Sequence, residues 1–303
     1  MNSITNKPIL SIIVPVYNGE KYILSTIKSL ISLNKKIDFE LIFQDSCSKD
    51  STVKIIKKHL KFFKDAEIFI EKDTGQSNGI NRGIARSNGI FVTWLCADDL
   101  LLPEFEKIFK ILKTNKYDFV YGDCIFLTNK TINPAIGTEN YVLGKLLKKR
   151  LFIQQPGTCI RKSKWIEANG LDEKLNWTMD YDLFIKLSLL RSKFFRLSKF
   201  ISVARIHPEA KTSSGSYLRL FEYLKIFSHH HIENLQYFSI TPYLVYGVEY
   251  FIKMLESRKF SGRMLKILHN FFWKIAKPIE IEKINFQFNK DKKIILKLLQ
   301  RYE

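Results

Sequence analysis

Two adjacent carboxylates, Asp98 and Asp99, end an apolar stretch of the chain and are followed by two leucines. The residues at 90–95 are of the type that forms a buried β-strand. Neighbouring carboxylates repel each other and lose hydration, so the pair is costly unless a cation or the hydroxyl groups of a ligand compensate it. The pair therefore indicates a ligand or cation site, and an ordinary acidic turn after a strand is the alternative.

The same arrangement recurs along the first hundred residues. A continuous apolar run predicts a strand buried on both faces at 9–16, and further strands are expected at 39–44, 66–70 and 90–95. Each strand is followed by polar or acidic residues: Tyr17 and Asn18, then Asp45, then Asp73, then Asp98 and Asp99. The carboxyl ends of parallel strands meet at one edge of a sheet, where open α/β sheets bind their ligands. We therefore expect these side chains to line one site.

Helices are predicted between these strands. Apolar residues recur at helical spacing in 20–32, 53–63 and 80–86, with a glycine-punctuated loop at 73–79. This alternation predicts an α/β fold in which a mostly parallel sheet has helices on both faces. Later in the chain we expect helices at 103–114, 162–170 and 179–190, strands at 117–127, 151–161 and 200–206, and a hairpin tip at 129–130.

From residue 215 onward the chain changes character. Aromatic, aliphatic and basic residues there predict helices at 217–227 and 242–256, so we divide the chain into an α/β domain at 1–214 and a helical region at 215–303. Basic residues beside apolar helix faces are typical of segments that rest on an anionic membrane. A helical extension that packs on the first domain or forms a homo-oligomer explains the same pattern. The sequence leaves these alternatives open.

Composition limits the class of partner. The 303 residues have a formal net charge of +19, which favours nucleic acid, an anionic membrane surface or phosphorylated small molecules. The positive charge is spread along the chain, and no helix-turn-helix, zinc-finger or RNP pattern occurs, so we expect no nucleic-acid partner. The four cysteines form no CxxC pair, and no apolar stretch is long enough to span a bilayer. We expect a cytoplasmic protein, soluble or peripheral on the inner face of the cell membrane.

Five segments, in this order, resemble motifs of glycosyltransferase family 2: 11–18 (SIIVPVYN), 44–52 (QDSCSKDST), 75–83 (GQSNGINRG), 97–99 (ADD) and 179–183 (MDYDL). The resemblance covers about residues 9–212. It implies the GT-A fold, a Rossmann-like α/β architecture, and inversion at the anomeric carbon of the transferred sugar. It also implies a nucleotide diphosphate sugar donor, with a UDP-sugar favoured, and a hydroxyl of a glycan or lipid-linked acceptor. A hexosyl- or N-acetylhexosaminyltransferase of bacterial cell-surface polysaccharide biosynthesis is the expected class.

The resemblance assigns the donor site to residues in four of these segments. It implies a base and ribose pocket formed by Pro15, Val16, Tyr17, Asn18 and Asp45. Tyr17 would pack on the nucleotide, and Asp45 would accept hydrogen bonds from the base. Along the rest of the donor it implies Gln76, Asn78, Arg82 and, on the ribose hydroxyls, Asp98. A guanidinium binds phosphate in bidentate fashion, so Arg82 suits the diphosphate, and a solvated helix face is its alternative.

A divalent cation, Mg²⁺ or Mn²⁺, is also implied by the resemblance. Asp99 would hold the cation between the two phosphates, because hard cations combine one or two carboxylates with phosphate oxygens. His207 matches a family position after the last core strand and would complete the metal or phosphate contacts. A structural histidine is the alternative for His207.

Inversion requires one general base on the acceptor side. Asp180 matches the family position of that base and would take the proton of the attacking hydroxyl. The family usually has Glu before this Asp, whereas this chain has Met179. Asp182 is the competing candidate and points to another helix face. Gln155 and Trp177 border the acceptor in this interpretation, with packing as their alternative role.

Three other classes compete with this interpretation. A basic nucleic-acid-binding protein would need a basic surface rather than an acidic sheet edge. A sugar-phosphate nucleotidyltransferase usually opens with a glycine-rich basic loop after the first strand, and residues 16–19 (VYNG) are not one. A non-catalytic family member is disfavoured because Asp99 and Asp180 are both present.

Overall fold

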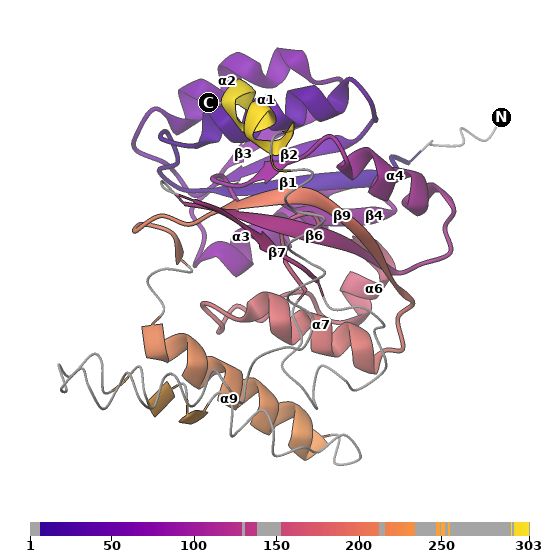
Figure 1. The fold of residues 1–303 in the computed structure, drawn as a ribbon, viewed down its shortest axis with the longest axis vertical. Coiled ribbons are helices and arrows are strands. Elements are labelled where there is room, and N and C mark those ends of the chain that lie inside the picture. The colour runs from indigo at the N-terminus through magenta and orange to yellow at the C-terminus, as the bar shows by residue number, and fades with distance from the viewer. Residues whose placement is uncertain are drawn as a thin grey trace.

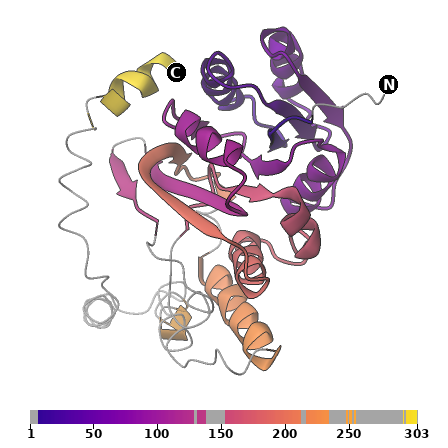
Figure 2. The ribbon, with the colours of Figure 1, turned by 90° about the vertical axis from the view of Figure 1, so that its right-hand side faces the viewer.

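The apolar runs of the sequence form the strands of one sheet, which has helices on both faces (Figures 1 and 2). The computed structural model describes residues 7–128, 131–137, 153–211 and 216–233, together with 247, 248, 250, 251, 254, 292 and 294–302. The strands are β1 (Leu10–Val16), β2 (Glu40–Asp45), β3 (Ala66–Ile70), β4 (Phe91–Trp94), β5 (Leu100–Leu101), β6 (Phe119–Leu127), β7 (Ile132–Ala135), β8 (Cys159–Arg161) and β9 (Phe194–Arg205). The helices are α1 (Ile23–Asn34), α2 (Thr52–His59) with the short η1 (Leu60–Phe62), α3 (Gln76–Arg86), α4 (Phe105–Lys113), α6 (Lys162–Glu167), α7 (Met179–Leu189) and α9 (Ser216–Glu233).

The sheet has the strand order β3-β2-β1-β4-β8-β6-β9-β5, and β7 pairs with β6. The first four strands are mutually parallel, so their carboxyl ends lie at one edge. Antiparallel β8 joins β4 to β6, and β6 then runs parallel to β9. The predicted α/β class and the helices on both faces are confirmed.

Alternate residues of the central strand β1 enter different hydrophobic clusters. Ile12 and Val14 pack with α1, α2 and α4 on one face, whereas Ile13 packs with α3, α6 and α7 on the other. Successive side chains of a strand point to opposite faces, so a strand covered on both sides must be apolar throughout. This burial explains the continuous apolar run in the sequence and fixes the edge where β1 ends.

The described parts of the C-terminal region pack on the α/β domain. Helix α9 lies outside α7 and buries Leu220, Ile226 and Phe227 in the same cluster as α7 (Figure 1). The helical residues at 294–302 bury Ile295 and Leu299 against β5, β6 and β9. The helix predicted at 217–227 is thus present and longer than expected. The helix predicted at 242–256 lies mostly outside the described residues, of which 247, 248, 250, 251 and 254 are helical.

Several segments differ from the sequence prediction. The short β5 was not expected, and β9 begins at Phe194, before the strand expected at 200–206. The strand expected at 151–161 is present only as β8, because Gln155–Gly157 form a turn in which Gly157 has a φ of 85°, outside the β region. Helix α3 starts at Gln76, inside the expected loop, directly after Gly75 with a φ of 144°. Glycine tolerates such a φ, so it ends the loop and lets the helix begin. The hairpin tip expected at 129–130 lies outside the described residues.

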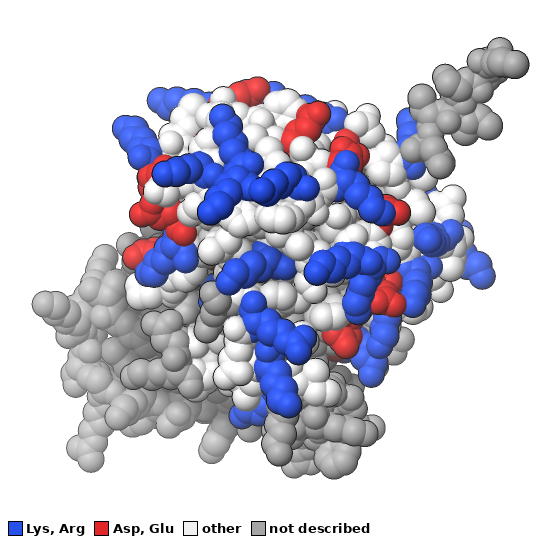
Figure 3. All heavy atoms as spheres, turned by 90° about the horizontal axis from the view of Figure 1, so that it is seen from above, with Lys and Arg blue, Asp and Glu red and all other residues white. Residues whose placement is uncertain are grey.

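Basic residues are numerous on one face of the molecule. On the side that carries α1 and α2, Lys and Arg spread over the face with Asp and Glu among them (Figure 3). Within the described part of the chain, no helix is both long and apolar enough to cross a bilayer.

Candidate active site

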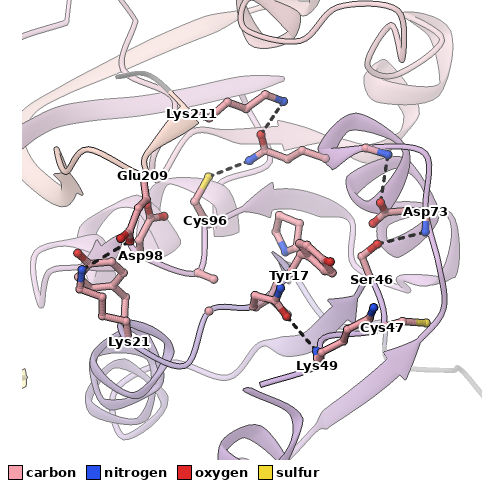
Figure 4. A pocket seen from close by; sticks show the side chains of 18 of the residues that line it. Tyr17, Lys21, Ser46, Cys47, Lys49, Asp73, Cys96, Asp98, Glu209 and Lys211 are labelled. Carbon is pink, nitrogen blue, oxygen red and sulfur yellow. Dashed lines mark hydrogen bonds and ion pairs between the residues drawn. The ribbon is translucent and has the colours of Figure 1, made fainter. Parts of the chain in front are cut away.

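A cavity of about 860 Å³ lies at the carboxyl ends of the parallel strands (Figure 4). Its wall is formed by the segments that follow β1, β2, β3, β4 and β9: residues 15–19, 21, 22, 46, 47, 49, 72–76, 96–98, 207, 209 and 211. The expected convergence of strand ends on one site is therefore observed. We call this space the first cavity.

The loops after β1 and β2 shape one side of the first cavity. Asn18 takes a positive φ of 48° and binds the second loop twice, through its own N–H to Ser48 Oγ at 2.8 Å and through Oδ1 to the N–H of Lys49 at 2.9 Å. Tyr17 projects from this tied turn, and 60% of it is exposed. An exposed aromatic ring held on a fixed loop is suited to pack against a planar ligand.

Asp45 lies beneath this surface rather than on it. It is fully buried, and its carboxylate accepts hydrogen bonds from the N–H and the hydroxyl of Ser48. Asp45 therefore holds the loop after β2, while Ser46, Cys47 and Lys49 of that loop line the cavity. Direct contact between Asp45 and a base stays a prediction.

Gln76, the first residue of α3, lies between the two sides of the site. Its Nε2 donates to Cys96 Sγ at 3.2 Å, and its Oε1 accepts from Lys211 Nζ at 3.2 Å (Figure 4). Burial lowers the pKa of Lys211 and raises that of Cys96 well above its usual range, so the thiol stays protonated at neutral pH. Gln76 thereby joins three segments that are distant in sequence.

Two other predicted donor residues on α3 lie outside the described wall of the first cavity. Asn78 donates to Glu173 Oε2 at 3.0 Å, and Arg82 forms an ion pair with Glu71 and a hydrogen bond to the carbonyl of Lys72 at 2.9 Å. The cations that do line the cavity are Lys21, Lys49, Lys72 and Lys211. The predicted contact of Arg82 with a diphosphate thus has less geometric support than contacts from these lysines.

The turn that carries Asp98 and Asp99 is anchored by α1. The buried hydroxyl of Thr26 donates to the carbonyls of Ala97 and Asp99, at 2.8 and 2.9 Å. Asp98 Oδ2 lies 2.9 Å from His207 Nε2, and the His207 ring packs on Tyr22. The sequence interpretation that placed His207 at the site is therefore supported by its position beside Asp98.

Asp99 is nearly buried, with 6% of its surface exposed, and accepts a hydrogen bond from the N–H of Arg205 at 3.1 Å. Burial, reinforced by the charge of Asp98, raises its pKa well above the usual range. The ligand atoms of Cys96, Asp98 and Asp99 lie within 4.8 Å of one another. Two carboxylates that repel each other beside a histidine form a donor set that suits a hard or borderline divalent cation.

A second cavity of about 460 Å³ adjoins the first. Both cavities are lined by Gln76, Cys96, Asp98 and Lys211, so these residues form the boundary between them. Asp99 and Asp180 line only the second cavity. Gln155 and Trp177, which the sequence placed at the acceptor, line it too.

Asp180 is at the N-terminus of α7 and accepts a hydrogen bond from the N–H of Tyr181 at 2.8 Å. Burial raises the pKa of Asp180 to about 6, although the charges of Arg219 and Lys211 oppose the rise. A carboxylate with such a pKa is ionised at neutral pH and is basic enough to accept a proton in catalysis.

Asp182, the competing candidate, has different surroundings. Burial works against its charged form, but hydrogen bonds from His230 and Lys186 hold its pKa below the usual range. His230 Nε2 is 2.8 Å from one carboxylate oxygen, and Lys186 Nζ is 2.7 Å from the other. Asp182 lies outside the described lining of both cavities, so the geometry favours Asp180.

The model of the family described as Glycosyl transferase family 2 matches residues 11–166, which is more than half of the chain. The chain belongs to this family. An uncharacterized glycosyltransferase of Methanocaldococcus jannaschii is 27% identical over 253 residues, which are 78% of this chain and 84% of that protein.

Solved structures share the fold of this family 2 glycosyltransferase at low sequence identity. S. aureus TarS in complex with UDP-GlcNAc has a TM-score of 0.58 and 20% identity, with 78% of this chain and 75% of that chain covered. The mannosyltransferase PcManGT of Pyrobaculum calidifontis, in complex with GDP-Man and Mn²⁺, has a TM-score of 0.53 and 13% identity, with 89% and 70% covered. The GT-A fold expected from the sequence is confirmed.

The sequence motifs missed several residues of the glycosyltransferase site. Lys211 follows β9, and Arg219 and Tyr223 project from α9 into the second cavity. All three lie beyond the region that the family model matches. For Arg219 and Tyr223 the sequence signal was the basic and aromatic composition after residue 215, which gives no position. Lys211 lies before that change and belongs to no motif. Their roles depend on how the C-terminal part packs on α7.

Proposed function

We propose that this family 2 glycosyltransferase moves a sugar from a nucleotide diphosphate sugar to a hydroxyl of a glycan or lipid-linked acceptor, with inversion of configuration. The observation that carries the proposal is the pair of adjoining cavities, which meet at Asp98 and have Asp180 on one side only. With the donor in the first cavity and the acceptor in the second, the acceptor hydroxyl would approach the anomeric carbon from the side opposite the departing diphosphate. Such an approach is what a single displacement with inversion requires.

The first cavity has the groups that a nucleotide diphosphate sugar needs. Tyr17 offers an exposed ring to the base, Asp98 offers a carboxylate to hydroxyl groups, and the four lysines offer charge to the diphosphate. We favour a UDP-sugar as donor, in line with the UDP-GlcNAc complex of TarS, with GDP-mannose as the alternative given by PcManGT. We propose that the transferred group is a hexosyl or N-acetylhexosaminyl group and that the reaction belongs to cell-surface polysaccharide synthesis.

A divalent cation fits beside this donor. Asp98 and Asp99 would supply carboxylate oxygens, and His207 a ring nitrogen, to Mg²⁺ or Mn²⁺. When bound, such a cation supplies Lewis-acid stabilisation of the charge on the departing nucleoside diphosphate. The cation would also relieve the repulsion between the two carboxylates.

Asp180 would act as the general base. The acceptor hydroxyl oxygen forms a bond to the anomeric carbon, its proton moves to the Asp180 carboxylate, and the bond from that carbon to the diphosphate oxygen breaks. Lys211 at the boundary of the cavities would stabilise negative charge on the departing diphosphate.

Replacement of Asp180 by Asn tests this assignment. We expect Asp180→Asn to lower transfer by at least about 100-fold, because a general base typically contributes that much, while UDP binds as in the wild type. The measurement is release of UDP or GDP from a panel of UDP- and GDP-sugars with octyl glycosides as acceptors, paired with calorimetry of UDP binding.

Asp182→Asn in parallel separates the two candidate bases. Turnover near the wild-type level in Asp180→Asn, together with its loss in Asp182→Asn, would transfer the role to Asp182. Turnover near the wild-type level in both variants would contradict a base on α7.

A further inference from the structure

The carboxylate of Glu222 on α9 is bound entirely to the segment that precedes α7. Its Oε1 accepts from the N–H of Asn176 at 2.9 Å, and its Oε2 accepts from the N–H groups of Trp177 and Thr178, at 2.9 and 3.2 Å. The hydroxyl of Thr178 adds a fourth bond at 3.0 Å. Glu222 is only 8% exposed.

This arrangement is more than a surface contact. Burial of a carboxylate costs free energy unless the carboxylate is paired or hydrogen-bonded, and here four donors satisfy it. Three of the donors are consecutive backbone N–H groups next to the positive end of the α7 dipole, where negative charge is favoured. Thr178 is the N-cap residue of α7 and makes no side-chain cap of its own. Its hydroxyl is instead bound to Glu222, so the residue at which α7 begins is held by another helix.

The segment held by Glu222 forms one wall of the second cavity. Trp177 lies within it, and Asp180 follows Thr178 by two residues. Helix α9 contributes Arg219 and Tyr223 to the same cavity, so one helix both holds the segment and completes the wall. A second tie, His230 to Asp182 at 2.8 Å, joins α9 to α7 further along.

We propose that Glu222 is a positioning residue that fixes the start of α7 and thereby directs Asp180 towards the acceptor. This proposal rests on the proposed function, in which Asp180 is the base. A displacement of about 1 Å of a reacting group can cost about 100-fold in rate. The four hydrogen bonds of Glu222 end at Thr178, two residues before Asp180, so their loss should lower turnover. Helix α9 is then part of the catalytic unit, although it lies beyond residue 166, where the family match ends.

The decisive variants are Glu222→Ala and Glu222→Gln, with Glu233→Gln as the matched control. Glu233 is also a glutamate of α9, but its side chain is 55% exposed and pairs with the exposed His229. We expect Glu222→Ala to lower kcat for transfer at least tenfold, with the KM for the donor and the affinity for UDP within twofold of wild type. Glu222→Gln keeps the side-chain volume and one acceptor oxygen, so its loss should be smaller. Glu233→Gln should match the wild type.

The pH profile distinguishes positioning from a loss of stability. The charges of Arg219 of α9 and of Lys211 act on Asp180, and Arg205 of β9, Asp98 and Asp99 line the same cavity. Glu222 of α9 acts in turn on Lys211. If Glu222→Ala exposes Asp180 further to water, the pKa of Asp180 falls and the acidic limb of kcat moves to lower pH. A variant that is only less stable keeps the limb where it is near pH 6.

The double variant Glu222→Ala with Asp180→Asn separates the two proposals. If Glu222 acts through Asp180, the double variant is no slower than Asp180→Asn alone. Normal kcat in both single Glu222 variants, with Asp180→Asn inactive, would overturn the positioning role and leave the base intact. Normal transfer in Asp180→Asn would instead overturn the proposed function. If Glu222→Ala fails to fold, as its UDP affinity would reveal, Glu222→Gln decides: kcat within twofold of wild type contradicts the proposal.

Discussion

Asp180 and Asp182 are two residues apart on one helix, yet their surroundings give them opposite properties. Burial raises the pKa of Asp180 to about 6, and the carboxylate faces a cavity. Asp182 is tied to His230 and Lys186, which hold its pKa low despite burial. A carboxylate that already binds a lysine and a histidine side chain has little basicity left for a substrate proton. At the scale of single residues, environment therefore decides which Asp is suited to be the base.

The raised pKa of Asp180 has a consequence for stability. Between about pH 4, where an ordinary Asp ionises, and about pH 6, the unfolded chain has lost this proton and the folded chain has kept it. Wild-type stability therefore falls as pH rises through this window, and Asp180→Asn, which does not titrate, should escape the fall. We expect the difference in melting temperature, Asp180→Asn minus wild type, to increase by about 2–4 °C from pH 4 to pH 6.5, measured by calorimetry. A difference that does not change with pH would contradict this account.

Asp99→Ala tests the cation site. In the wild type, Mn²⁺ or Mg²⁺ should raise the affinity for UDP. In Asp99→Ala this rise should be at least about tenfold smaller, because one of two carboxylate ligands is removed. Calorimetry of UDP with and without the metal measures this rise. Asp38→Ala is the control, since the side chain of Asp38 is 76% exposed and pairs with Lys64. Metal-stimulated affinity that is unchanged in Asp99→Ala would reject the site.

At the scale of elements, short loops are held by side chains from neighbouring helices and loops. Thr26 of α1 fixes the Asp98–Asp99 turn, Asn18 joins the loops after β1 and β2, and Glu222 of α9 holds the start of α7. The helices cover the sheet and also provide the donors and acceptors that set loop geometry. The site is thus as rigid as the packing of these elements.

Thr26→Val tests the anchoring of the carboxylate turn. The substitution keeps the side-chain volume but removes the hydroxyl, which leaves two buried carbonyls without this donor. We expect a loss of about 1–3 kcal/mol in the free energy of unfolding, measured in urea, and weaker metal-dependent UDP binding. The matched change Thr114→Val removes an exposed hydroxyl that bonds to Ile111, and it should cost under about 0.5 kcal/mol. Equal effects of the two changes would count against the anchoring role.

At the scale of the whole molecule, described segments after residue 215 pack against the α/β domain. Helix α9 joins the cluster that contains α7, and residues 294–302 cover β5 and β9. These contacts favour the sequence alternative in which the C-terminal region packs on the first domain. Contact with an anionic membrane and formation of a homo-oligomer stay predictions.

Leu299→Ala tests how much the last helical turns contribute to stability. Leu299 is buried in a cluster with Leu100 and Val203, so its truncation should lower the free energy of unfolding by about 2–4 kcal/mol. Leu296→Ala is the matched control, because Leu296 is on the same helical segment and 42% exposed. Urea unfolding of both variants gives the comparison. Similar losses below about 0.5 kcal/mol would show that the segment adds little.

The sequence alone determined the order of elements and the edge of the sheet at which the site lies. Strands buried on both faces are mostly apolar, so local composition predicted them. Parallel strands end at one edge of the sheet, so Tyr17 and Asp98, which follow two of them, were expected to lie close together there. A family motif also predicted Asp180 as the general base. What local pattern did not give was the start of α3 at Gln76 or the turn at 155–157, where one glycine φ decides the conformation.

Only the tertiary structure decided which side chains face the cavities. Arg82 fits a phosphate by type, but its position beside Glu71 pairs it there, and the motif holds no information about that neighbour. Lys211 and Glu222 carry no motif at all and become functional candidates because β9 and α9 bring them next to α7. A side chain's partners depend on contacts between segments far apart in the chain, and these contacts exist only after the elements have packed.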